Sequence, residues 1–236
     1  MRAWLVPLAL LMLFGCLALP IVEESSSVTY VLKADGALRT TQITEGTLTP
    51  DAEDWPADCT TKLRETIDSL LTLAQTFGGG TAEEMETFRN VTQALQLVKN
   101  RMTCSFRKSG GKGTLEISTE LSQDDQQRLQ DLLGKDEENT PHVDRNPDAT
   151  FTFKAPVMKI ASERWFDEIR IIVEGEVINI TPGYELEGNA YVYRDPAAIQ
   201  GDFIEVTYRP KAQICPGIFF VLGILAAGGF VLWRLG

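Results

Sequence analysis

Residues 214–233 form a continuous stretch of twenty residues without a charged side chain. A helix of this length rises about 30 Å, at about 1.5 Å per residue, and this matches the hydrocarbon thickness of a bilayer. Pro216 suits the start of such a helix, and Trp233 followed by Arg234 is typical of an interfacial anchor. The stretch therefore predicts a C-terminal transmembrane helix and removes these residues from any soluble core.

The N-terminal residues 1–22 have the layout of a secretory signal, because Arg2 precedes an apolar run that small residues follow. The sequence Leu-Phe-Gly-Cys at 13–16 is similar to a lipobox, which predicts cleavage and lipidation at Cys16. Ordinary cleavage near Ala18 and retention of residues 3–22 as an N-terminal anchor are the alternatives. All three outcomes place the middle of the chain outside the cytoplasm.

Charged residues are concentrated between the two apolar ends. Residues 23–213 hold 20 of the 22 basic residues and all 33 acidic ones, which leaves a net charge of −13 there. Binders of nucleic acid need clustered Lys and Arg, so we expect no nucleic-acid partner. His142 is the only histidine, which excludes a zinc centre with two or more imidazole ligands, and we expect no cofactor.

Two cysteines, Cys59 and Cys104, lie between the apolar ends, whereas Cys16 and Cys215 belong to those ends. In an oxidising compartment Cys59 and Cys104 are the natural partners for a disulfide bond. The alternative for this pair is two buried thiols. A bond between them would close a loop that contains two predicted helices.

Two further kinds of polar site are suggested by short motifs. Asn90 and Asn179 begin sequons and would be glycosylated if the host is eukaryotic. Asp144, Asn146 and Asp148 have the alternate spacing with which a calcium loop begins. The sixth and twelfth positions of that motif are alanines, so we favour a turn-forming polar segment over a metal site.

Apolar periodicity predicts an α+β fold in which a helical hairpin is inserted among antiparallel β-sheets. An Asp35-Gly36 turn joins the first two strands, and Ser122 and Asp125 cap a short helix later in the chain. The expected elements are strands at 28–33 and 37–43, two helices within 60–101, a hairpin within 102–121, a helix before Gly134, and strands near 151–153, 168–173, 176–180, 189–194 and 203–209.

Composition divides the exported portion into three parts. Residues 23–134 form an α+β subdomain with the helical hairpin, and residues 135–150 form an acidic linker or long loop. Residues 151–213 form a β-rich part that ends next to the transmembrane helix at 214–233. We therefore expect this last part to lie close to the bilayer.

The layout resembles that of the actinobacterial LppM-type lipoproteins and related uncharacterised envelope proteins. The likeness rests on the export signal near Gly15-Cys16, the first hairpin with Val-Thr-Tyr-Val-Leu-Lys-Ala-Asp-Gly, the segments Gly175-Glu-Val-Ile-Asn and Glu187-Gly-Asn, and the single C-terminal span. Phe14 and the helical hairpin depart from that pattern. The resemblance implies a compact α+β domain that binds envelope lipid or surface partners, and it supplies no catalytic residues.

We therefore expect a single-pass membrane protein whose exported domain is a non-enzymatic binding or structural component of the cell envelope. One alternative is a lipid carrier or sensor, in which apolar faces enclose an acyl chain. A second alternative is a carboxylate-dependent hydrolase, for which the acidic runs 51–54 and 136–138 are the nominal source of catalytic groups. The sequence names neither the partner nor the host.

Overall fold

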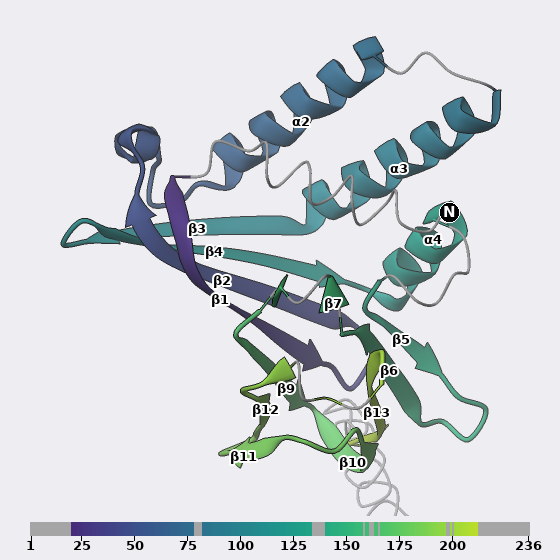
Figure 1. Ribbon diagram of the computed structural model, residues 1–236. Coiled ribbons are helices and arrows are strands. Elements are labelled where there is room, and N and C mark those ends of the chain that lie inside the picture. The colour runs from purple at the N-terminus through teal and green to yellow at the C-terminus, as the bar shows by residue number, and fades with distance from the viewer. Residues whose placement is uncertain are drawn as a thin grey trace, which may run out of the picture.

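The structure is a computed structural model that describes residues 20–77, 82–133, 140–157, 159–160, 163–164, 166–196, 199 and 201–211. These residues form two packed β-sheets, a two-stranded hairpin and three α-helices (Figure 1). The α+β class predicted from the sequence is therefore confirmed for the described part of the chain.

The larger sheet has seven strands in the order β11-β12-β9-β1-β2-β4-β3. Its neighbouring strands are antiparallel except for β1 and β9, which are parallel. The strands are β1 (Ile21–Leu32), β2 (Leu38–Leu48), β3 (Met102–Ser109), β4 (Lys112–Leu121), β9 (Glu168–Val173), β11 (Glu185–Glu187) and β12 (Ala190–Tyr193).

The smaller sheet has four antiparallel strands in the order β10-β13-β6-β5. Its strands are β5 (His142–Arg145), β6 (Phe151–Pro156), β10 (Gly175–Ile180) and β13 (Phe203–Pro210). A separate hairpin consists of β7 (Lys159–Ile160) and β8 (Glu163–Arg164).

One face of the larger sheet carries apolar side chains along its width. Paired residues on neighbouring strands share a face, so the register places Val28 of β1, Ile117 of β4 and Cys104 of β3 on the same side. Val28 contributes to the core against the smaller sheet, whereas Cys104 contributes to the core under the helices. Two different layers therefore cover two regions of a single sheet face.

The N-terminal end of β1 keeps this face apolar by means of a bulge. The register shifts between Glu23 and Ser25, so Ile21 pairs with Leu48 and faces the helical core, although its parity differs from that of Val28. The bulged strand lies close to β2, because a Cβ atom on Gly46 would stand 1.8 Å from the carbonyl oxygen of Val22. Glycine is required there because any side chain would displace β1.

The helical hairpin covers the β3–β4 end of the sheet (Figure 1). It consists of α2 (Thr60–Phe77) and α3 (Ala82–Arg101), and a 3-10 turn at Pro50–Asp54 lies before it. Buried residues of α2, β3 and β4 form one apolar cluster together with Trp55, which follows the turn. The α2, β3 and β4 members of this cluster are Leu63, Ile67, Leu71, Met102, Cys104, Phe106 and Leu115. The helical spacing noted in the sequence therefore marks a packing face.

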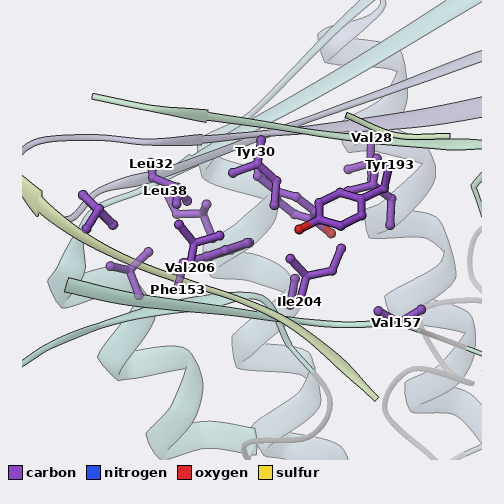
Figure 2. Close-up of a cluster of buried hydrophobic side chains, with 14 of the residues drawn as sticks. Val28, Tyr30, Leu32, Leu38, Phe153, Val157, Tyr193, Ile204 and Val206 are labelled. Atoms are coloured by element: carbon purple, nitrogen blue, oxygen red, sulfur yellow. The ribbon is translucent and has the colours of Figure 1, made fainter. Parts of the chain in front are cut away.

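The second core lies between the two sheets. Figure 2 shows its labelled side chains lying between two layers of strands. The Tyr30 and Phe153 rings lie 5.1 Å apart between centroids, and the Phe151 and Tyr208 rings lie 5.5 Å apart. The hydroxyl of Tyr208 donates to the backbone oxygen of Lys33 at 3.0 Å, which links β13 to the turn after β1. Burial raises the pKa of Tyr208, so its hydroxyl keeps the proton that it donates.

A third helix, α4 (Gln123–Leu133), joins the two sheets at one edge. The predicted cap is present, because Ser122 and Asp125 exchange side-chain-to-backbone hydrogen bonds of 3.1 and 3.2 Å. The buried amide of Gln126 donates to the backbone oxygens of Gly36 and Leu121 and accepts from the N–H of Val143 at 2.7 Å. This one side chain therefore links the β1–β2 turn, the end of β4 and strand β5.

The predicted linker at 135–150 differs from the structure, because residues 142–145 form β5 and bury Val143. The strand was missed because its polar composition is typical of a loop, whereas the tertiary partners Gln126 and β6 satisfy its backbone. The division into residues 23–134 and 151–213 also differs, since β9 and β12 of the second part join β1 in the larger sheet. Ser26 and Asp167, 141 residues apart, begin that pairing with two hydrogen bonds.

We predict that Gln126→Ala lowers the free energy of unfolding by about 2–4 kcal/mol, because it leaves buried backbone groups of Gly36, Leu121 and Val143 without a partner. The matched control is Gln127→Ala, since Gln127 is exposed and bonds only Asp131 within the same helix. This control should change the free energy by less than about 0.5 kcal/mol. Chemical denaturation measures both, and equal effects of the two substitutions would contradict the role of Gln126.

Candidate functional site

Cys59 and Cys104 are joined by a disulfide in the structure, with their Cα atoms 5.0 Å apart. Cys59 lies just before α2 and Cys104 lies on β3, and both are buried in the helical core. The N–H of Cys59 donates to the oxygen of Cys104, and Thr60 exchanges two further hydrogen bonds with the same residue. The bond therefore attaches the start of the helical hairpin to the edge of the larger sheet.

The chain next to this disulfide covers the edge of β3. Asp58 forms a β-bridge with Ser105, and the N–H of Phe106 donates to the oxygen of Ala57 at 2.8 Å. Covered edges do not pair with other chains, so the middle of this edge, at Cys104–Phe106, is protected from strand addition. Because the disulfide is buried and joins the start of α2 to β3, its role is structural: it fastens the helical hairpin to the sheet.

Two of the three calcium candidates, Asn146 and Asp148, lie in the turn between β5 and β6. The side chain of Asn146 donates to the hydroxyls of Thr150 and Thr152, each at 2.9 Å. The carboxylate of Asp148 accepts from Thr150, and these hydrogen bonds lower the pKa of Asp148. The third candidate, Asp144, lies on β5. Among the described residues, no cluster of three or more His, Cys, Asp or Glu side chains is placed to hold a metal ion.

His142 is buried at the start of β5, where its Nδ1 lies 2.9 Å from the oxygen of Thr140. Its Nε2 faces the carboxylate of Asp144 at 3.4 Å.

The two asparagines that begin the sequons differ in their exposure to solvent. Asn90 is half-buried on α3, and Asn179 is exposed next to the bulge of β10.

Two carboxylates, those of Asp125 and Glu120, show how neighbouring cations and hydrogen-bond donors lower a carboxyl pKa in this fold. Asp125 is buried, and burial alone would raise its pKa, but hydrogen bonds from Ser122 and Arg101 outweigh burial and leave the pKa lowered. Hydrogen bonds from Lys33 and Arg39 likewise lower the pKa of Glu120. Of the acidic runs named above, 51–54 forms the 3-10 turn with its carboxylates exposed, and 136–138 lies outside the described residues.

An exposed apolar patch, which the sequence analysis missed, lies on β11 and the loop before it. Leu186 is 63% exposed and Tyr184 is 38% exposed. Leu186 pairs with Tyr191 of β12, and the Tyr184 ring stands 5.0 Å from the Tyr191 ring at a steep angle. We call Tyr184, Leu186 and Tyr191 the β11 patch. A further large apolar residue, Ile178, is 51% exposed on the edge strand β10.

An ion-pair network on the opposite face orients the β11 patch. Arg194 contacts Glu168 at 3.0 Å and Glu185 at 3.2 Å, and it also pairs with Glu187. Arg170 contacts Glu168 at 2.5 Å and Glu187 at 3.2 Å. Successive side chains of a strand point to opposite faces of the sheet. Leu186 therefore lies on the face opposite to Glu185, Glu187 and the two arginines. The alternation Glu-Leu-Glu at 185–187 was the available signal, although the sequence analysis expected no strand there.

Several predicted features lie outside the described residues. These include Cys16, the signal or anchor up to residue 19, and the transmembrane helix at 214–233. Among the helices that the structure does describe, none has the length and apolar character needed to cross a membrane. The structure therefore leaves the anchor as a prediction from sequence.

No protein-family model and no curated protein matches the chain. A search of solved structures finds a similarity to the folded domain of Mycobacterium tuberculosis LppM, determined by NMR. The match covers 84% of this chain and 96% of that one, with 10% sequence identity and a TM-score of 0.41. At this score and identity the similarity is a distant one of fold alone.

We predict that non-reducing digestion of the protein releases a peptide pair joined through Cys59 and Cys104. In the loop-entropy model, a closed loop of about 45 residues stabilises the fold by roughly 4 kcal/mol, so Cys59→Ala with Cys104→Ala should lower the free energy of unfolding by that order. Mass spectrometry that finds both cysteines as free thiols in protein from oxidising conditions would contradict the bond.

We predict that Asp125→Asn destabilises the fold at pH 6, and that the difference from the natural protein shrinks as the pH falls. The lowered pKa of Asp125 means that its stabilisation is complete above the unfolded value of about 4 and is lost as the pH falls through the folded value. The control is Asp124→Asn in the same helical turn, where the side chain is exposed. Urea titrations at several pH values measure this, and a constant difference would contradict the assignment.

Proposed function

We propose that this chain is a membrane-anchored, extracytoplasmic domain that acts as a non-enzymatic binding or structural component of the cell envelope. One observation carries the proposal. Strand β13 ends at Pro210, so three residues separate it from the twenty uncharged residues that begin at 214. A folded sheet that ends so near a predicted span holds its domain against the bilayer.

The disulfide supports the extracytoplasmic side of the proposal. Thiols in the cytosol are kept reduced, and stable structural disulfides form in exported proteins. Cys59 and Cys104 are buried and joined, and they connect a helix to a sheet edge. This arrangement suits a structural disulfide that forms after export.

The direction of the resolved carboxyl pKa shifts supports a non-enzymatic role. Acid catalysis by a carboxyl group needs a raised pKa, as in glycosidases with two carboxylates. Within the described residues, the carboxyl shifts that are resolved are downward, and the buried one belongs to a helix cap. These carboxylates are therefore suited to ion pairing.

We predict that the full-length protein stays in the membrane fraction after washes with high salt and with alkaline carbonate. Insertion through hydrocarbon burial resists both washes, whereas charge attraction is screened by salt. A charged pair of substitutions, Leu222→Arg with Leu225→Arg, costs about 2.5–3.5 kcal/mol per residue at the centre of a span. It should release a protein whose N-terminal segment has been cleaved without lipidation at Cys16. The matched control, Leu222→Ile with Leu225→Ile, should stay bound.

Release of the unaltered protein by either wash would contradict the anchor. Lipids of defined stoichiometry that co-purify with a truncated domain, seen by native mass spectrometry, would instead favour the lipid carrier. Turnover of a glycan that is abolished when one carboxylate is replaced by its amide would favour the hydrolase.

A further inference from the structure

We propose that the open side of the sandwich, where β10 and β11 are edge strands, rests on the bilayer surface through Ile178 and the β11 patch. This inference rests on the proposed function, because the bilayer is the one that the chain's own C-terminal segment enters. It adds an orientation and a lipid contact that anchoring alone does not require.

Exposed apolar residues gather on this side of the molecule. Five large apolar side chains are exposed among the described residues, and three of them lie between residues 178 and 186. Figure 1 shows β10 and β11 at the end of the molecule remote from α2 and α3. The other two, Val22 and Met85, belong to β1 and α3 and lie apart from the three. The gathering is therefore a local feature of the β10–β11 side.

The position of β13 brings this side near the predicted span. Strand β10 pairs with β13 from Gly175, opposite Pro210, to Ile180. Ile178 lies opposite the interval between Tyr208 and Thr207, so it stands about 8 Å along the sheet from Pro210, at about 3.3 Å per residue. Residues 211–214 span at most about 13–14 Å when extended. Ile178 is thus within reach of the interface.

The two edge strands are poorly suited to a protein strand as partner. Strand β10 carries a bulge between Val177 and Asn179, and β11 has only three residues. Bulges and short edges are the devices with which proteins prevent edge-to-edge pairing. Exposed tyrosine and leucine side chains without a usable strand edge suit the lipid–water interface of a membrane. Contact with lipid does not require the partner to align with the strand. Tyrosine in particular is enriched at the level of lipid head groups.

The charges around the patch favour neutral lipids. The carboxylates of Glu176 and Glu185 are exposed, with 73% and 68% of their side-chain surface accessible. Both acids lie on the strands that carry the apolar residues. Each carboxylate is paired with an arginine, Glu176 with Arg209 at 3.8 Å and Glu185 with Arg194 at 3.2 Å. The local charge is therefore balanced, and it suits a zwitterionic surface such as phosphatidylcholine.

The test uses the full chain in phosphatidylcholine nanodiscs, with Cys16→Ser and Cys215→Ser so that a spin label reacts at one introduced cysteine. Leu186→Cys places the label on the patch. Met85→Cys is the matched control, because Met85 is 50% exposed on α3. We expect the ratio of oxygen to nickel-chelate accessibility to be several-fold higher for the label at 186 than for the label at 85.

Equal aqueous accessibility at both positions, in protein that co-elutes with the nanodiscs, would overturn this inference and leave the anchor standing. Failure of the unsubstituted chain to co-elute with nanodiscs would instead overturn the proposed function. If Leu186→Cys does not fold, as judged by circular dichroism, Ile178→Cys serves in its place. A spin label at residue 178 that is as accessible to the nickel chelate as the label at residue 85 would overturn the inference in the same way.

Discussion

The apolar face shared by β1, β2, β4 and β3 extends beyond the reach of a single covering layer, and the rest of the fold follows from the need to cover it. The helical hairpin buries the end near Cys104, and the smaller sheet buries the end near Val28. The two layers leave a junction where backbone groups from both would lose their contact with water. Gln126 fills that junction with three hydrogen bonds, so α4 serves as the connection between two otherwise separate cores.

Local features of this design could be predicted from the sequence. The turn at Asp35-Gly36 and the cap formed by Ser122 and Asp125 each depend on residues close in sequence, and the structure contains both. Helical periodicity likewise identified α2 and α3, because one face of each contacts the same core. These elements carry their own signal and do not depend on a distant partner.

Features that depend on distant partners could not be predicted. The parallel pairing of β1 with β9 joins residues about 140 positions apart, and a parallel ladder leaves no turn signal between its strands. Strand β5 is polar, and it is ordered by Gln126 and by β6. The β11 patch was missed because Leu186 lies in a segment of three residues between acids, and its exposure depends on where Arg170 and Arg194 hold those acids.

The proposed function joins three parts of the chain that differ in kind. In this proposal, the apolar segment at 214–233 would supply the anchor and the β10–β11 side would supply a lipid contact. The disulfide fastens the helices at the far edge of the larger sheet. The sheet order places the disulfide-bearing strand β3 and the patch-bearing strand β11 at opposite edges. If the β11 side rests on the bilayer, the helical hairpin points away from it and is available to other envelope components.

The central claim is that this domain is held on the outer side of a membrane, and the sidedness of Met85 tests it most directly. Met85 is exposed on α3, so Met85→Cys in the Cys16→Ser and Cys215→Ser background offers one accessible thiol. The account predicts that a membrane-impermeant maleimide labels this cysteine in intact cells, in protein that remains with the membrane fraction. Labelling only after the cells are lysed would contradict the account.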